Sequence, residues 1–376
     1  MKIGLTSRPL YARDATSTPP ERMVSRRFRW RTRSMRRRVL GVQPPSRVLT
    51  RRTLNRLVGA GRAPEAPPWR VVARQRLAAW DESLIEYRGS EDDPIRAYLL
   101  EPHQPRAGRP AVLCLHQHAG EFDMGKSEPA GRAGSPDQAY AVELAARGFV
   151  TLAPDALCFE DRRDEVLAGA QYERFAFAER VLRGTSLQAT YIADSRLAMS
   201  LLAAHPTVNA RAIGAIGHSL GGQQALFLAA IDRRVRAAVS SCGFASYESF
   251  LRGRINHNFA AYVPGLLRHG DTGDILALVA PRSFLALAGD SDRIFPIEGV
   301  QASVELARAV YAAQGAERSL VLDIDSGGHA FGQPRRAIAY QFLADHLTTE
   351  KARNAAGHRR STTMSFRSTA PSAGRT

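Results

Sequence analysis

The sequence predicts an α/β fold, a mostly parallel sheet of eight strands with helices on both faces. Short apolar runs alternate with helix-period segments along the middle of the chain, as expected for such a layered fold. Several runs, such as residues 111–115 (AVLCL), are apolar throughout, as strands covered on both faces are. The chain of 376 residues, 44% of them hydrophobic, is long enough for one large core. No apolar run approaches the roughly 20 residues that a membrane span needs.

The expected elements lie between residues 83 and 347, and no internal repeat is visible. Apolar runs bounded by turn residues predict strands at 83–88, 94–101, 111–116, 149–153, 212–217, 236–241, 283–288 and 319–323. Segments with helical periodicity predict helices at 137–147, 188–204, 221–231, 298–314 and 334–347. Two long excursions, 158–188 and 243–274, interrupt this alternation, and insertions of this kind commonly form a lid over the carboxyl edge of the sheet.

The net charge of +16 is confined to the two ends of the chain. Residues 1–70 hold 18 basic and 3 acidic residues, and residues 350–376 hold 6 and 1. The intervening residues 71–349 hold 28 basic and 32 acidic residues, which argues against a nucleic-acid surface on this part. We expect one catalytic domain over 71–349, with a disordered Arg-rich arm before it and a disordered tail after it, because both ends are poor in large apolar residues.

The arm has several possible interpretations. Its Arg-rich, acid-poor composition is compatible with a transit peptide, a nucleic-acid arm or a solvated tail, and Met23 and Met35 are alternative starts. It lacks the apolar stretch of a secretory signal. Three scattered cysteines indicate neither a disulfide framework nor a zinc site and fit a reducing compartment. We therefore expect a cytoplasmic protein without membrane attachment.

The strongest chemical signal is a serine between two glycines at a strand-to-helix junction. Residues 217–222 read GHSLGG, after the apolar run AIGAI and before the helical run QQALFL. Glycines two positions either side of a serine let the backbone reverse sharply, so that the hydroxyl is presented at the sheet edge and the N-terminus of a helix. Ser219 is the candidate nucleophile, a capping serine in a tight turn being the alternative.

A serine nucleophile needs a histidine base, and His329 is the best candidate. It follows the predicted strand at 319–323 within the small-residue segment SGGHAF, which could fold over Ser219. The competing histidines lie in a polar loop, in a helix or in the C-terminal tail: His257, His269, His346 and His358.

The third member of such a triad is a carboxylate at a strand end that orients the histidine. Residues 289–296 (GDSDRIFP) offer Asp290 and Asp292. Asp292 is preferred, because Asp290 directly follows a glycine and is suited to capping the turn. The chain order serine, aspartate, histidine is that of the α/β-hydrolase triad.

Two backbone amides should form the oxyanion hole. Leu220 follows the nucleophile and offers its N–H. The loop at 116–120 (HQHAG) offers the N–H of His118, with Gln117 as the alternative, whereas His116 is expected to hold the loop by hydrogen bonds.

These motifs together resemble the dienelactone hydrolase-like branch of the α/β-hydrolase superfamily, near bacterial acetyl xylan esterases and prolyl oligopeptidases. The resemblance spans about residues 83–347 and rests on GHSLG at 217–221, GDSDRIFP at 289–296 and GHAF at 328–331. It implies an α/β-hydrolase fold and places the triad acid at Asp292. Two positions depart from the pattern: Gln117 replaces a glycine of the oxyanion loop, and Ser219 stands where dienelactone hydrolases use cysteine.

The predicted function is hydrolysis of a small-molecule carboxylic ester through an acyl-enzyme, without metal or organic cofactor. One alternative is a peptidase of the prolyl-oligopeptidase type, against which stands the lack of an N-terminal propeller in the first 70 residues. The other is a catalytically silent fold that serves as a binding protein. The sequence leaves the oligomeric state, the acyl group and the leaving group open.

Overall fold

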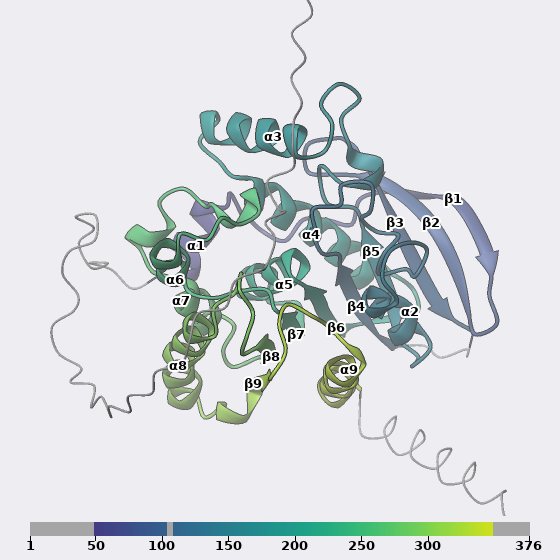
Figure 1. Cartoon of the computed structure of the whole chain (residues 1–376). Helices are drawn as coiled ribbons and strands as arrows, with labels where there is room; N and C mark the ends of the chain where they lie inside the picture. The colour runs from purple at the N-terminus through teal and green to yellow at the C-terminus, as the bar shows by residue number, and fades with distance from the viewer. Residues whose placement is uncertain (1–48, 104–107, 349–376) are drawn as a thin grey trace, which may run out of the picture. The chain divides into compact units, whose positions relative to one another are not determined.

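The computed structural model describes residues 49–103 and 108–348, and these residues fold around one sheet of nine strands (Figure 1). The strands are β1 (Trp69–Arg76), β2 (Trp80–Arg88), β3 (Pro94–Pro102), β4 (Arg109–Leu115), β5 (Val150–Pro154), β6 (Val208–His218), β7 (Val235–Ser241), β8 (Ser283–Gly289) and β9 (Leu320–Asp325). Their spatial order is β1-β2-β3-β5-β4-β6-β7-β8-β9. The eight predicted strands are all present, and β1 was not predicted.

The sheet is parallel from β5 to β9 and antiparallel from β1 to β3. The antiparallel strands reverse direction through short connections, whereas each parallel strand from β6 onward is reached through a helical crossover. Because the parallel strands all point one way, their carboxyl ends lie along one edge of the sheet. The loops after β4, β6, β8 and β9 therefore meet there, which is the arrangement that the predicted site requires.

Helices cover both faces of the sheet. They are α1 (Arg51–Leu57), α2 (Tyr140–Ala145), α3 (Ala170–Leu182), α4 (Leu187–Ala204), α5 (Leu220–Ile231), α6 (Tyr247–Gly253), α7 (Thr272–Ala277), α8 (Ile297–Ala313) and α9 (Gln333–Leu347). One apolar core packs α2 and α9 against the sheet, and a larger one packs α1, α4, α5, α7 and α8 against its other face. The predicted two-faced α/β architecture is thus confirmed. Among the described residues, no helix has both the length and the apolar character required to cross a bilayer.

The end of the expected N-terminal arm is folded, which corrects the prediction of disorder up to residue 70. Thr50 caps α1 through its side chain, and Leu54 and Val58 are buried in the larger core. The basic composition concealed this, because the Arg51 side chain turns inward to the carbonyls of Ala230 and Leu278. The rest of the predicted arm, residues 1–48, and the predicted tail from residue 350 lie outside the described residues.

Candidate active site

Ser219 occupies a sharp turn between β6 and α5. Its φ of +54° lies in the left-handed region, where a side chain is strained unless the surroundings hold it. The turn is possible because glycines flank it closely. A Cβ on Gly221 would lie 1.9 Å from the carbonyl oxygen of Leu115, and one on Gly217 would lie 2.2 Å from the carbonyl carbon of Gly221. The glycine spacing in the sequence is therefore explained by backbone contact within the turn.

Asp292 and His329 form a hydrogen-bonded pair at the ends of β8 and β9. His329 Nδ1 lies 2.8 Å from Asp292 Oδ2, while the backbone amides of Ile294 and Phe295 donate to Oδ1 at 3.0 and 3.1 Å. The two loops can approach because β8 ends in Gly289, where a Cβ would lie 2.2 Å from the carbonyl oxygen of Gly327. Asp290 is exposed, and its one hydrogen bond within the described residues is from its backbone N–H to the carbonyl of Asp325. The structure thus brings Asp292, and not Asp290, against the histidine.

The pair also determines the charge of the imidazole. Burial alone would lower the pKa of His329, but the hydrogen bond that it donates to Asp292, a contact with Cys242 and the carboxylate charge together raise that pKa to about 9. Burial opposes ionisation of Asp292, yet the hydrogen bond and charge of His329 and the two backbone amides lower the pKa of this carboxyl below its ordinary value. The hydrogen bond and the opposite charges thus favour the protonated imidazole and the ionised carboxylate together.

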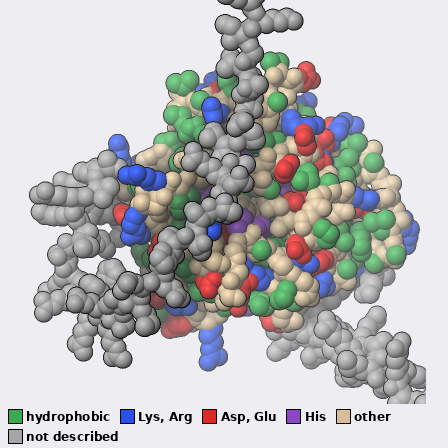
Figure 2. Space-filling view, viewed as in Figure 1, with side chains coloured by type: hydrophobic (Ala, Val, Ile, Leu, Met, Phe, Trp, Pro, Cys, Tyr) green, Lys and Arg blue, Asp and Glu red, His purple; other side chains and the backbone are tan. Residues whose placement is uncertain are grey.

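Aromatic rings fix the plane of His329. The Phe295 ring stacks on it with a centroid separation of 5.5 Å, and the ring of His218, next to Ser219 in the chain, lies 4.7 Å away. Burial lowers the pKa of His218 to about 3 and that of His257, which packs on Phe295, to about 4. Burial thus disfavours the charged form of both, whereas His329, whose pKa is raised, is the histidine of this group that most readily takes up a proton. Histidine side chains gather at the centre of the face shown in Figure 2.

The Ser219 hydroxyl makes no hydrogen bond to His329 within the described residues. His329 uses Nδ1 for Asp292, so its other ring nitrogen, Nε2, is the one that remains for the serine. Catalytic hydrogen bonds of this type are often long in ligand-free enzymes and shorten when substrate binds.

The predicted oxyanion donors lie beside this turn. Leu220 is the first residue of α5, and neither its N–H nor those of Gln117 and His118 take part in a hydrogen bond within the described part of the chain. Close packing of Gly221 against the end of β4 brings α5 to the loop that carries Gln117 and His118. His116 holds this loop as expected, because its Nε2 accepts the N–H of Ala156 at 3.0 Å.

A residue that the sequence analysis missed, Glu173, joins the 116–120 loop to the two excursions, 158–188 and 243–274. His118 Nδ1 accepts the N–H of Gly120 at 3.0 Å, which leaves Nε2–H to donate to Glu173 Oε2 at 3.1 Å. Glu173 lies on α3 with only 3% of its surface exposed, and its other oxygen accepts the N–H of Phe259 at 3.4 Å. One carboxylate thus ties together α3, the 116–120 loop and the second excursion.

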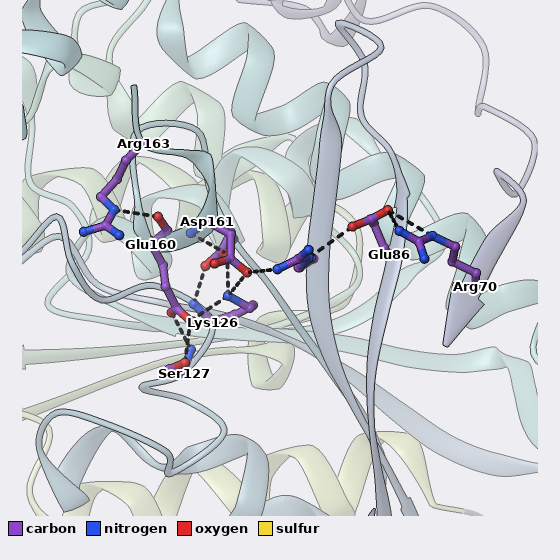
Figure 3. Close-up of polar contacts among 9 residues, drawn as sticks. Arg70, Glu86, Lys126, Ser127, Glu160, Asp161 and Arg163 are labelled. Carbon is purple, nitrogen blue, oxygen red and sulfur yellow. Dashed lines mark hydrogen bonds and ion pairs between the residues drawn. The ribbon is translucent and has the colours of Figure 1, made fainter. Parts of the chain in front are cut away.

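A buried lysine anchors the chain that follows the oxyanion loop (Figure 3). Lys126, 2% exposed, lies 2.8, 2.6 and 2.8 Å from carboxylate oxygens of Asp155, Glu160 and Asp161. Desolvation would lower the pKa of Lys126, but these three carboxylates raise it. Burial and the neighbouring Glu160 raise the pKa of Asp155 to about 7 despite the lysine charge. These carboxylates have the spacing of a metal site, and the ammonium group supplies the cation.

Replacing Lys126 with methionine should destabilise the fold by about 3–5 kcal/mol at pH 8, because it leaves buried carboxylates without a partner. The loss should shrink as the pH falls from 8 toward 7, because Lys126 lowers the pKa of Asp155 in the wild type and the Asp155 of the variant therefore takes up a proton at a higher pH. Urea unfolding of the wild type and the Lys126→Met variant at both pH values measures this loss of stability. The matched change Arg163→Met, which breaks an exposed pair with Asp123, should cost no more than about 1 kcal/mol. Equal losses in the two variants would contradict the anchoring role.

Comparison with known proteins identifies the family of the chain. The dienelactone hydrolase family profile matches residues 95–358. YtaP from Bacillus subtilis (strain 168) is 33% identical over 267 residues, which cover 70% of this chain and 87% of YtaP.

Solved structures share the fold at low sequence identity. The glucuronoyl esterase from Solibacter usitatus superposes with a TM-score of 0.57 at 18% identity, covering 79% of this chain and 92% of that enzyme. The acetyl xylan esterase from Paenibacillus sp. R4 gives 0.55 at 16% identity, covering 79% and 93%. With the family profile matching more than half of the chain and the sheet order and serine turn described above, this protein belongs to the dienelactone hydrolase family and has the α/β-hydrolase fold.

Proposed function

We propose that this protein is a serine esterase that hydrolyses carboxylic esters through Ser219, His329 and Asp292. The observation that carries the proposal is the hydrogen-bonded Asp292–His329 pair beside a serine in a strained strand-to-helix turn. A carboxylate that orients a histidine near a serine at the carboxyl edge of the sheet is the arrangement that activates serine for acyl transfer.

In the acylation step, Ser219 Oγ attacks the ester carbonyl carbon while its proton moves to His329 Nε2. The carbonyl oxygen becomes an oxyanion, to which the N–H groups of Leu220 and His118 donate. The intermediate then collapses, the bond to the alcohol oxygen breaks, and His329 returns the proton to the leaving alcohol. Asp292 stabilises the imidazolium throughout.

Deacylation repeats these steps with water as the nucleophile. His329 takes a proton from water as its oxygen attacks the acyl carbon, and the same two amides hold the second oxyanion. The bond to Ser219 Oγ then breaks, the serine regains its proton, and the carboxylic acid leaves. The names of the structural neighbours, which include acetyl xylan and glucuronoyl esterases, favour a small acyl group or a sugar-derived ester as substrate.

A fluorophosphonate probe tests the proposal directly. The probe should label Ser219, identified by mass spectrometry of the digested protein, and pre-labelled protein should lose turnover of p-nitrophenyl acetate. Absence of labelling with intact folding would favour the alternative prediction of a silent binding protein. Turnover of short peptides but not of esters would favour the peptidase alternative.

The pH dependence of ester hydrolysis should follow the raised pKa of His329. Only the neutral imidazole accepts a proton, so kcat/KM should increase with pH through a midpoint well above 6.5, near 9. Initial rates from pH 5 to 10, with Ser219→Ala protein as the blank for spontaneous hydrolysis, measure this. A rate that reaches its plateau below pH 6 would contradict the assignment of His329 as an ion-paired base.

Replacing Glu173 with glutamine should lower kcat by roughly 10- to 100-fold, because His118 loses a charged acceptor and its backbone N–H shifts within the oxyanion hole. KM should change little, since the N–H acts mainly on the transition state. The matched variant Arg174→Gln, on the exposed side of α3, should keep wild-type kcat. If the two variants have the same kcat, Glu173 does not position the loop.

A further inference from the structure

A pocket lies at the edge of the sheet opposite to Ser219. Its volume is about 330 Å³, and its lining includes the start of β8 and the turn between α5 and β7. Five of its eight lining residues are basic side chains: Arg51, Arg233, Arg236, Arg282 and His346. Because β6, β7 and β8 run parallel, this amino-end pocket is separated from the carboxyl edge by the length of the strands.

Two of these arginines are fixed in place by backbone carbonyls. Arg51 Nε donates to Ala230 at 2.8 Å. Arg282 donates to Ala229, Val235 and Asp232 at 2.6, 2.9 and 3.1 Å. These contacts lie around the C-terminus of α5, where the helix dipole favours a cation. Capping of α5 therefore accounts for Arg51 and Arg282.

Capping does not account for Arg233 and Arg236. Both are exposed, and within the described residues neither donates a side-chain hydrogen bond or forms an ion pair. Asp232, the adjacent carboxylate in the chain, is already bound by Arg234 at 2.6 Å and lies 3.7 Å from Arg196. Two further guanidinium groups thus converge on the pocket without a partner.

The pocket consequently holds several positive charges and, over the described part of the chain, no carboxylate paired with any of its four arginines. Burial, followed by the charges of Arg51, Arg233 and Arg236, lowers the pKa of Arg282 to about 10. Burial and the charge of Arg233 likewise lower the pKa of Arg51. The charges of Arg51, Arg233 and Arg236 add to the effect of burial on Arg282, and a bound anion would offset the repulsion among these like charges.

We propose that this pocket binds a compact anion that carries two or three phosphate groups. A guanidinium group can donate two parallel hydrogen bonds to the oxygens of one phosphate. Each phosphate group brings up to two negative charges. A di- or triphosphate can therefore balance the charge of four arginines, whereas a single carboxylate cannot. The volume is at the lower end of the range for small-molecule sites, which suits such an anion. The proposal does not depend on the esterase activity.

Calorimetric titration of the full-length protein with sodium tripolyphosphate tests it, at about 0.15 M salt, where distant charges are screened. The variant Arg233→Gln/Arg236→Gln should bind tripolyphosphate at least about tenfold more weakly, because two charge-assisted contacts are lost. The control Arg308→Gln/Arg174→Gln removes the same charge from exposed sites on α8 and α3 and should bind as the wild type does. Arg51 and Arg282 are left intact because they cap α5.

A second measurement locates the anion. Phenylglyoxal modifies accessible arginines, and tripolyphosphate should protect Arg233 and Arg236 but not Arg308, as read by mass spectrometry. ATP arms in both experiments distinguish a nucleotide from an inorganic phosphate chain, since a base that contributes contacts makes ATP the tighter ligand. Equal affinity in the two double variants, or protection confined to the basic chain ends, would overturn the proposal.

Discussion

Replacing Ser219 with alanine should reduce kcat for p-nitrophenyl acetate by at least about 10³-fold, and up to about 10⁶-fold, with little change in folding. The hydroxyl is the nucleophile that forms the acyl-enzyme in the proposed reaction, and in serine hydrolases its loss leaves just the rate that oxyanion binding and substrate positioning provide. The substitution to alanine also keeps the backbone hydrogen bond from the N–H of residue 219 to the carbonyl of Ser241, so the turn should persist.

The matched control is Ser291→Ala, an exposed serine on the same loop as Asp292. This variant should keep wild-type turnover, and thermal unfolding of both variants should stay close to that of the wild type. Residual esterase activity above about 10% in the Ser219 variant would contradict the proposed mechanism and leave the family fold without this chemistry. Loss of activity in both variants would show that the measured turnover does not depend on Ser219 in particular.

The predicted strands agree with the structure because most of them are buried along nearly their whole length. From β4 to β8, strands covered on both faces must be apolar at nearly every position, and that pattern is readable without knowledge of the fold. Strand β1 lies at the sheet edge with all eight residues exposed, so it has no burial pattern to read. Its pairing with β2 is made by backbone hydrogen bonds, so hydrophobic periodicity in the sequence does not predict it.

The hydrophobic pattern of the sequence did not predict helix α3, because charged side chains of this helix are buried and apolar ones are exposed. The buried positions are Glu173, Ala176 and Arg180, whereas Phe175 and Leu182 are 54% and 88% exposed. Arg180 is compensated by Glu91 and Thr190, and Glu173 by His118, which are partners from other parts of the chain. Only tertiary structure makes such a helix stable, so its apolar pattern points away from the core.

The difference between local sequence patterns and contacts of distant segments applies to the candidate site as well. Local rules placed Ser219, Asp292 and His329 because glycine spacing and strand ends are properties of neighbouring residues. The contacts of Cys242 with His329 and of Glu173 with His118 join segments that are far apart in sequence, so no local motif predicts them. Sequence reasoning therefore reaches the proposed catalytic residues before it reaches those that hold them in place.

Asp292→Asn should lower kcat by about 10⁴-fold while shifting the pH profile toward acid. Asparagine has the same shape and can still accept the N–H groups of Ile294 and Phe295, so the loop should persist. It removes the charge that raises the pKa of His329, and its amide favours the tautomer that cannot accept the serine proton. Burial, which lowers the histidine pKa, is then opposed only by the contact with Cys242, and the midpoint of the rising limb should fall from near 9 toward 6.5.

Rate measurements across pH for Asp292→Asn and Asp290→Asn separate the two carboxylates of the loop. Asp290 is exposed and does not contact His329, so its variant should keep kcat within about twofold and the wild-type midpoint. Reversed behaviour of the two variants would make Asp290 the triad acid, which would require the loop after β8 to rearrange in solution. An unchanged midpoint in Asp292→Asn would mean that the carboxylate does not set the charge of the imidazole, and the high pKa of His329 would then need another cause, with Cys242 the nearest group to test.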